Sequence, residues 1–245
     1  HLLGTNFATT YDITFENEAG EQEYVNQTCY GVSERCIAAL ISVHGDDVGL
    51  VLPWSVAPVQ VVIVPILFKD KEGTLEVCRN LKAKLVAAGM RVTIDESDER
   101  PGAKFYKWEL KGVPIRIEIG PRDIKNGVAV LARRDGKKLT APLDGLEQAI
   151  LAEAADLHEA MVAKAQAFLE SKVKDCETAE EAKEQTSTGV ARVWWCGSEE
   201  CGHRIEDEVG AALLGEPWRA QEIYQGGCIV CGAKTEKCAL LARQY

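Results

Sequence analysis

Four cysteines in the last fifty residues have the spacing of metal ligands. Four residues separate Cys196 from Cys201, two separate Cys228 from Cys231, and 26 lie between the two pairs. Pairs at such short spacings form the knuckles of tetrahedral thiolate zinc sites. A glycine directly follows three of the four cysteines, as tight knuckle turns require. The sequence therefore predicts one structural Zn²⁺ held by four thiolates.

Two alternatives to this zinc site remain open from the residues alone. The cysteines could form disulfides, but the five other cysteines stand singly among apolar or helical neighbours, as reduced thiols do in a cytoplasmic protein. His203 could replace one ligand, although four cysteines already complete a site. Because a closed four-thiolate site has no position for water or substrate, we expect it to stabilise a fold, by on the order of 10 kcal/mol, and not to catalyse.

A basic window stands out in an acidic chain. The net charge of the 245 residues is −10, which argues against general nucleic-acid binding. Between Lys104 and Lys138, however, ten basic residues face four acidic ones, so this window carries +6 and the remainder −16. The window predicts a local surface for a polyanion.

The elements that position these residues alternate between strand and helix patterns. The predicted strands are Val59–Leu67, Arg91–Asp95, Ile115–Ile119 and Val128–Ala132, with helical spacing between the first two, a short helix over "RPGAKFYKWELKG" and a long helix from Leu146. Prolines near position 56 indicate a linker. We expect an α/β (α+β) protein with three domains, at 1–56, 57–145 and 146–245, and no membrane span.

Six ordered motifs carry a family resemblance. They are "HLLGTNF", the Glu-Arg pair of "CYGVSERCIAALI", "HGDDVGLVLP", "WELKGVPIRIEIGPRD", the four-cysteine spacing and a terminal tyrosine. Together they resemble prolyl-tRNA synthetase of the archaeal and eukaryotic-like type, a class II aminoacyl-tRNA synthetase. The resemblance implies the end of a class II antiparallel-sheet catalytic domain, a mixed-sheet anticodon-binding domain and a small zinc-binding C-terminal domain.

The resemblance also implies an activity and a substrate site. The family couples proline to ATP, with Mg²⁺, and transfers proline from prolyl-adenylate to tRNA(Pro). Arg35 matches the motif 3 arginine that binds the γ-phosphate, which suits a permanently charged guanidinium. Read alone, an arginine before an apolar run more often forms an ion pair at a helix start than a phosphate contact. The other implied substrate contacts are His1, Phe7, Gly31, Ser33 and Tyr245, and for the smaller ones sheet structure is an equal alternative.

The chain departs from the family pattern in two respects. Tyr30 replaces the usual tryptophan, and Glu34 stands where many relatives have threonine or an aromatic residue. Motif 1, at the interface of the family's homodimer, and motif 2 would precede His1. The expectation is therefore that the chain alone is inactive.

The basic window coincides with the implied anticodon-binding domain. Because a proline anticodon ends in two guanines, carboxylates and Arg or Lys side chains could read their edges. The expected tRNA contacts are Glu109, Lys111, Arg116, Glu118, Arg122, Lys125, Arg133 and Arg134, the last three on phosphates. Phe105 or Trp108 could stack on a base, although core packing is favoured. A solvated charged face is the alternative for each contact.

Two other functions compete with a proline–tRNA ligase. A non-catalytic tRNA-binding protein built from the last two domains would bind tRNA without forming an adenylate. A different class IIa synthetase, for threonine, glycine or histidine, would share the middle domain but not the zinc spacing or the terminal tyrosine.

Overall fold

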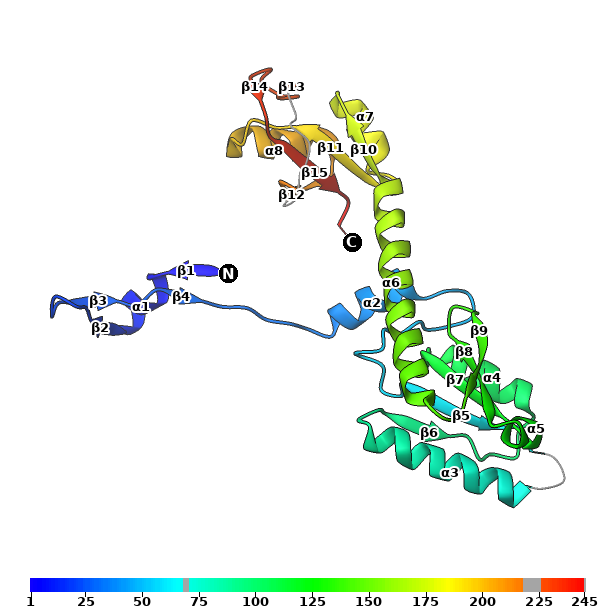
Figure 1. Cartoon of the computed structure of the whole chain (residues 1–245). Helices are drawn as coiled ribbons and strands as arrows, with labels where there is room; N and C mark the ends of the chain where they lie inside the picture. The colour runs from blue at the N-terminus through cyan, green and yellow to red at the C-terminus, as the bar shows by residue number, and fades with distance from the viewer. Residues whose placement is uncertain (68–70, 218–225, 245) are drawn as a thin grey trace. The chain divides into compact units, whose positions relative to one another are not determined.

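The computed structural model describes residues 1–67, 71–217 and 226–244 and contains two compact units, His1–Leu157 and His158–Tyr245 (Figure 1). Helices and sheets occur in both units, so the expected mixed α/β class is confirmed. None of the helices in the described ranges has the length and apolar character that crossing a membrane would need.

A five-stranded sheet forms the centre of the first unit. Its strands are β5 (Val61–Pro65), β6 (Val92–Ile94), β7 (Ile115–Ile119), β8 (Val128–Arg133) and β9 (Lys138–Pro142), in the order β6-β5-β7-β8-β9. The first three are parallel, whereas β8 and β9 join antiparallel. The four predicted strands are confirmed, and β9 was not predicted.

Helices cover both faces of this sheet. They are α3 (Lys71–Ala87), α4 (Pro101–Leu110), α5 (Pro121–Lys125) and α6 (Leu146–Lys172). Successive side chains of a strand point to opposite faces, and β5 is buried at every residue. Its Ile63 packs in a cluster with Leu81 of α3 and Ile150 of α6, whereas Val62 packs with Trp108 of α4. The sheet therefore lies between α3 and α6 on one side and α4 on the other.

Local sequence sets where these helices begin and end. Pro101 occupies the first turn of α4, where the missing N–H costs nothing. Asp123 accepts a hydrogen bond from the Gly120 N–H at 2.8 Å and so caps α5. The first turns of α6 pack in the core of the first unit. The boundary expected at residue 145 therefore separates residues that pack together, and the division in the structure lies at 157/158.

The second unit is built on a four-stranded sheet that was not predicted. Its order is β10-β11-β15-β12, and its elements are β10 (Val173–Cys176), α7 (Ala179–Gln185), β11 (Val190–Trp194), α8 (Glu199–Val209), β12 (Ala212–Gly215) and β15 (Cys238–Ala242). A two-residue pair, β13 (Gly226–Gly227) and β14 (Lys234–Thr235), adds a hairpin. Val193 and Leu241 from the sheet pack with Ile205 of α8. The unit thus has an apolar core besides its cysteines.

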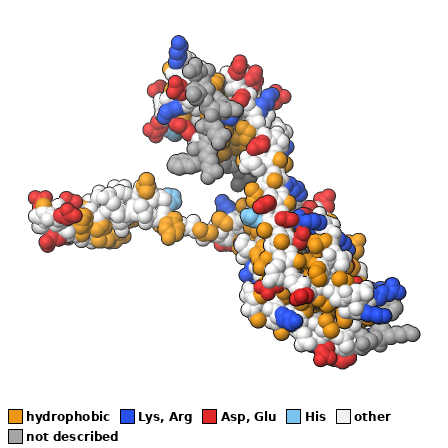
Figure 2. All heavy atoms as spheres, viewed as in Figure 1, with side chains coloured by type: hydrophobic (Ala, Val, Ile, Leu, Met, Phe, Trp, Pro, Cys, Tyr) orange, Lys and Arg blue, Asp and Glu red, His pale blue; other side chains and the backbone are white. Residues whose placement is uncertain are grey.

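The first fifty residues contain little buried surface. Their elements are β1 (Leu2–Gly4), α1 (Asn6–Tyr11), β2 (Thr14–Glu16), β3 (Gln22–Tyr24), β4 (Gln27–Thr28) and α2 (Arg35–His44), with β1 paired to β4 and β2 to β3. Ala8 is the one buried residue of this segment, and the apolar helix α2 buries none. Figure 2 shows the apolar side chains lying open along the segment. A helix this apolar is normally covered by other structure.

Candidate metal centre and nucleic-acid interface

The four predicted cysteine ligands form one cluster. One sulfur from each of Cys196, Cys201, Cys228 and Cys231 lies within 4.8 Å of the others. The Cys196 and Cys231 sulfurs are 4.0 Å apart. Zinc–sulfur bonds of about 2.3 Å place tetrahedral sulfurs roughly 3.8 Å apart, so a small contraction of the cluster would accommodate the metal.

Two knuckles that brace each other bring the sulfurs together. The first joins β11 to α8, where the Ser198 hydroxyl accepts a hydrogen bond from the Cys201 N–H. The second lies between β13 and β14, where the Gly232 N–H bonds to the Cys228 carbonyl at 2.8 Å. The Ile229 N–H donates to the Trp194 carbonyl at 3.2 Å and links the two knuckles.

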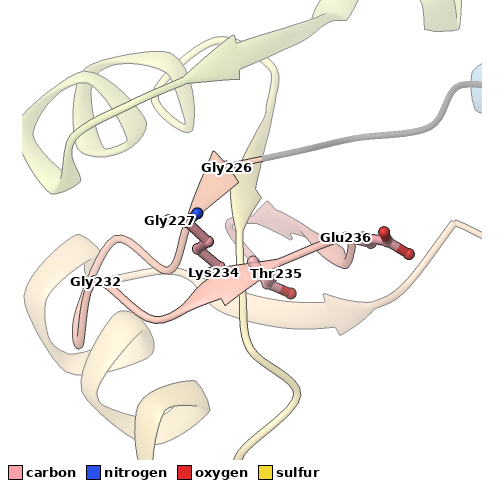
Figure 3. Close-up of a pocket in the computed structure, with 6 residues that line it drawn as sticks. All are labelled: Gly226, Gly227, Gly232, Lys234, Thr235 and Glu236. Carbon is pink, nitrogen blue, oxygen red and sulfur yellow. The ribbon is translucent and has the colours of Figure 1, made fainter.

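Glycines shape the second knuckle. A side chain at Gly226 would lie 2.4 Å from the Trp194 ring, so the close approach of β13 to that ring requires glycine. A hollow of about 670 Å³ opens beside this hairpin, lined by Gly226, Gly227, Gly232, Lys234, Thr235 and Glu236 (Figure 3). The Thr235 hydroxyl donates to the Trp195 carbonyl at 2.9 Å. The hairpin is thus fixed to the first knuckle from both of its strands.

The thiols of the cluster differ in acidity. Burial raises the pKa of Cys201 to about 12, and hydrogen bonds with Cys196 and Cys231 act in the same direction. Burial also acts to raise the pKa of Cys228, but backbone donors at Cys231, Val230 and Cys196 outweigh it and lower the pKa to about 7. Cys228 is therefore the thiol of this pair that supplies a thiolate near neutral pH.

His203 lies apart from the sulfur cluster. Its side chain is exposed on α8, where the imidazole nitrogens are 3.7 Å from Glu199 and 3.5 Å from Glu206. The metal-binding group found among the described residues consists of the four cysteines alone.

The expected substrate contacts lie on the exposed N-terminal segment. The carbonyl of His1 accepts a hydrogen bond from the Cys29 N–H at 3.0 Å, which brings His1 close to the strand that leads to Gly31. Arg35 is the exposed first residue of α2, and its N–H bonds weakly to the Ser33 hydroxyl. Phe7 stacks on Tyr11 with ring centroids 6.4 Å apart. Tyr245 lies outside the described residues.

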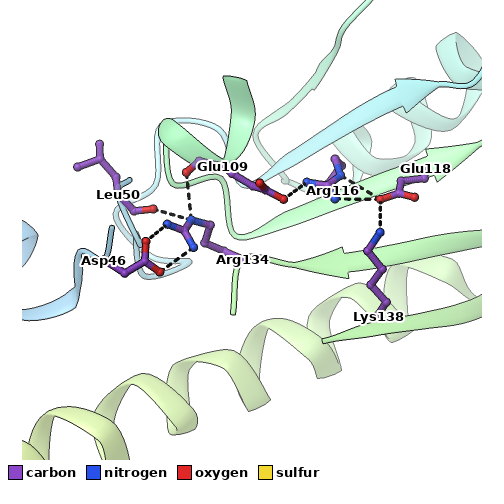
Figure 4. Close-up of polar contacts among 7 residues, drawn as sticks. All are labelled: Asp46, Leu50, Glu109, Arg116, Glu118, Arg134 and Lys138. Carbon is purple, nitrogen blue, oxygen red and sulfur yellow. Dashed lines mark hydrogen bonds and ion pairs between the residues drawn. The ribbon is translucent and has the colours of Figure 1, made fainter. Parts of the chain in front are cut away.

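A cluster of alternating charges lies on α4, β7 and β9. Arg116 donates to Glu109 at 2.9 Å and to Glu118 at 2.9 and 3.1 Å, and Lys138 donates to Glu118 at 3.1 Å (Figure 4). These bonds all go to Oε1 of each carboxylate. Arg116 is buried, whereas the Glu109 and Glu118 side chains are partly exposed.

Arg133 and Arg134 are not available as the sequence led us to expect. Both are buried, with side chains 5% and 4% exposed. Arg133 pairs with Asp135 and with Glu153 of α6, and Arg134 pairs with Asp46. Because their guanidinium groups are satisfied inside the protein, these contacts argue against the expected phosphate contacts and for a structural role.

Three cations among the expected tRNA contacts are accessible. Lys111, Arg122 and Lys125 are all exposed. The two aromatic rings pack against the β5 face and are also covered by cations: Arg116 lies 4.1 Å from the Phe105 centroid and Lys111 lies 4.7 Å from that of Trp108. These contacts favour core packing over base stacking for both rings.

Sequence reasoning missed two aspartates that organise this unit. Asp95 follows β6 and is buried with Lys104, and Asp46 holds Arg134. The glycine-flanked "HGDDVG" turn was a signal for the second, since its aspartates had no other evident use. For Asp95, the buried lysine on α4 was not recognisable from its local pattern.

Two family profiles match the chain. Residues 60–153 match a family described as "Anticodon binding domain". Residues 179–245 match one described as "Prolyl-tRNA synthetase, C-terminal". The first match covers the five-stranded sheet, helices α3 to α5 and the start of α6, and the second covers β11, β12, β15 and both knuckles of the second unit but not β10.

Curated relatives match from end to end of the chain. A proline–tRNA ligase of Methanothrix thermoacetophila is 60% identical over 246 aligned residues, those of Methanococcoides burtonii and Methanosarcina mazei are 52% and 49% identical, and each match covers 100% of this chain. The chain spans about half the length of these relatives, 51% to 52%.

Proposed function

We propose that this chain, which carries the anticodon-binding domain and the C-terminal domain of the prolyl-tRNA synthetase family, is the C-terminal half of a proline–tRNA ligase. The observation that carries the proposal is the 60% identity to such a ligase over the whole of the chain. The match of residues 179–245 favours proline over the other class IIa amino acids. In the cell the complete protein would act as a cytoplasmic homodimer.

The proposed reaction has two steps. Proline attacks the α-phosphate of ATP, which is bound with Mg²⁺, and yields prolyl-adenylate and pyrophosphate. The terminal ribose hydroxyl of tRNA(Pro) then takes the prolyl group and releases AMP. Arg35 would neutralise the charge that develops on the departing pyrophosphate, since a guanidinium presents fixed donors to phosphate oxygens.

The exposed apolar surface of residues 1–50 supports the proposal that this segment is part of a larger catalytic domain. The exposed fraction is 62% for Ile37 and 84% for Val32, on either side of Arg35. We propose that further catalytic-domain structure covers these apolar faces and that His1, Phe7, Gly31, Ser33 and Tyr245 contribute to the proline pocket there. The domains would then be residues 1–56, 57–145 and 146–245, and the first turns of α6 would pack against the middle domain.

The cysteine cluster would hold one structural Zn²⁺. Four thiolates complete a tetrahedral shell and leave no position for substrate. The metal would fix the β13–β14 hairpin against the start of α8, and its role in the reaction would be indirect.

The charge cluster around Arg116 suits recognition of guanine. Each hydrogen bond described for the Glu109 and Glu118 carboxylates uses Oε1, so Oε2 of either carboxylate could accept the N1 and N2 protons of a splayed guanine. Lys111 could donate to O6 or N7 of the same base. Arg122 and Lys125, exposed on α5, would contact phosphates.

Exchange of pyrophosphate into ATP tests the proposal on the full-length protein. We expect exchange to depend on proline. The variant Arg35→Ala should lower the exchange rate at least about 100-fold, as loss of one donor to a developing oxyanion does. Binding of the tRNA(Pro) anticodon arm should remain unchanged.

Matched variants separate this effect from misfolding. Arg204→Ala removes an arginine that is also exposed on a helix, where it pairs with Glu208, and it should leave exchange unchanged. Exchange driven by threonine, glycine or histidine instead of proline would overturn the assignment. Equal loss of exchange and anticodon-arm binding in Arg35→Ala would show misfolding.

The chain by itself would be a tRNA-binding fragment without ligase activity. The exposure of Arg35 and its apolar neighbours supports this second function for the isolated chain. Adenylate formation by the 245-residue chain alone would contradict it.

A further inference from the structure

The turn after α2 is closed by Asp46. Its carboxylate accepts hydrogen bonds from the Val48 N–H at 3.0 Å and the Gly49 N–H at 3.1 Å. The backbones of Asp46 and Gly49 also bond to each other in both directions at 3.1 Å. The turn therefore has a defined shape and begins two residues after His44, the last residue of the helix that Arg35 starts.

Two glycines allow this turn to lie against the end of α4. A side chain at Gly49 would come within 2.5 Å of the Leu110 Cα, and one at Gly112 within 2.7 Å of the Leu50 carbonyl oxygen. Without those side chains, the Leu50 N–H bonds to the Leu110 carbonyl at 3.1 Å. The contact is thus made between backbones and leaves little room for adjustment.

Arg134 joins this turn to the sheet. Its Nη1 donates to Asp46 Oδ2 at 3.0 Å, and Nη2 donates to Oδ1, in the two-pronged geometry that an arginine forms with a carboxylate. Its Nε donates to the Leu50 carbonyl at 2.8 Å and to the Glu109 carbonyl at 3.0 Å, so the cation also lies at the C-terminal end of α4 (Figure 4). The guanidinium lowers the pKa of Asp46 below its usual range.

The same contacts reach the charge cluster on β7. Glu109 accepts Arg134 through its carbonyl and Arg116 through its carboxylate. One residue of α4 is therefore shared between the turn after α2 and the side chains that we assign to anticodon recognition.

Arg133 provides a comparison within the same chain. It is as buried as Arg134, and it points to the opposite side of the chain, where it pairs with Asp135 and Glu153. Both partners belong to the anticodon-binding domain and the helix packed on it. Its ion pairs stabilise one domain, whereas those of Arg134 connect that domain to the segment of Arg35.

We propose that Arg134 is a positioning residue for tRNA charging. Through Asp46 it fixes the turn after α2 on the anticodon-binding domain. A tRNA held by its anticodon then presents its acceptor end at the correct position for the reaction centre. The inference rests on the proposed ligase function. It places Arg134 outside the chemistry of proline activation, which needs no tRNA.

The test compares three activities of the full-length protein. In Arg134→Lys, which keeps the charge but loses the fork, kcat/KM for charging tRNA(Pro) should fall about 10-fold to 100-fold, as a misplacement of about 1 Å can cause. Proline-dependent pyrophosphate exchange and anticodon-arm affinity should stay within about twofold. Asp46→Asn, at an exposed site, should reproduce this pattern, and the double variant should lose little more than either single one.

A second measurement needs only the 245-residue chain. Hydrogen exchange at the amides of Val48, Gly49 and Leu50 should accelerate about tenfold in Arg134→Lys. In the control Arg133→Lys these amides should keep their hydrogen-exchange rates. In the full-length protein, Arg133→Lys should lower tRNA charging and pyrophosphate exchange together if it lowers either.

The outcomes distinguish the two proposals. Equal losses of exchange and charging in Arg134→Lys, or undiminished charging, would overturn the positioning role. Unchanged amide exchange at the turn would overturn the contact on which it rests. Absence of proline-dependent exchange in the unaltered full-length protein would overturn the ligase function, while the amide measurement would still report on the ion pair.

Discussion

Asp95 illustrates how a single buried charge can stabilise the first unit. Its side chain, 2% exposed, accepts hydrogen bonds from Trp108 at 2.7 Å and Lys107 at 3.1 Å. Lys104, equally buried, donates to the Asp95 carbonyl oxygen at 2.8 Å and lies 3.9 Å from its carboxylate. Burial acts to raise the pKa of Asp95, but the donors from Ser97, Trp108 and Lys107 prevail and lower it below the usual range.

We expect Asp95→Asn to destabilise the first unit by about 3 to 5 kcal/mol at pH 7, because it leaves Lys104 buried without its anionic partner. The folded pKa lies below the unfolded value, so this stabilisation is complete above pH 4 and is lost as the pH falls toward the folded pKa. Hydrogen exchange of the β5 amides should give the free energy of unfolding.

The control for this prediction is Asp98→Asn, an exposed aspartate three residues away, which should change stability by less than about 0.5 kcal/mol. The difference between Asp95→Asn and the unaltered protein should shrink below pH 4. A difference that stays constant from pH 7 to pH 3 would contradict the role of the carboxylate charge.

The burial of Arg133 and Arg134 shows what the sequence pattern could and could not indicate. Charge counting placed ten cations in one window but could not tell which of them are solvated. Arg134 pairs with Asp46, 88 positions earlier in the chain, and Arg133 pairs with Glu153 on α6. Such partners come together only through the fold, so the burial of these two arginines could not be derived from their neighbours in sequence.

At the scale of elements, the two cysteine knuckles should depend on metal more than the sheet beside them. Metal analysis should give one zinc per chain. Chelation should release the β13–β14 hairpin and the first turn of α8, whereas the core around Val193, Ile205 and Leu241 should keep much of the four-stranded sheet. Amide exchange in β14 compared with β15 would measure this difference.

Cysteine variants provide the matched control. Cys228→Ser should abolish tight zinc binding, while Cys176→Ser, a buried cysteine outside the cluster, should retain it. Because thiols must lose protons to bind zinc, affinity should rise with pH, and it should rise less steeply above the Cys228 pKa of about 7, where that thiol has already lost its proton. A metal-free protein with unchanged melting would contradict the structural role.

The elements could be predicted where their patterns were long and local. The boundaries of β7 were predicted to the residue, and β5 to within two residues at either end. The sheet of the second unit was missed because its strands are short and β15 inserts between β11 and β12, out of chain order. That sheet supplies an apolar core in addition to the cysteine cluster.

The uneven charge of the whole chain predicts that the proposed binding of tRNA is sensitive to salt. A chain of net charge −10 repels nucleic acid except at its basic window. Three of the eight expected contacts, Lys111, Arg122 and Lys125, are exposed cations. Binding should therefore depend on a few phosphate neutralisations rather than on a broad basic surface.

The exposed side chain of Lys125 should contribute to tRNA affinity through a phosphate contact. If Lys125 contacts a phosphate, Lys125→Gln should reduce the slope of log K against log salt concentration by about 1 and should weaken binding of different tRNA sequences equally. Glu118→Gln should instead reduce the preference for tRNA(Pro) and leave the slope unchanged, because it alters a base contact. The control Lys164→Gln, an exposed lysine of α6 outside the window, should change neither quantity. Titrations of the 245-residue chain at four salt concentrations would measure both; a slope that Lys125→Gln leaves unaltered would exclude the phosphate contact, because a lost neutralisation must release fewer counterions.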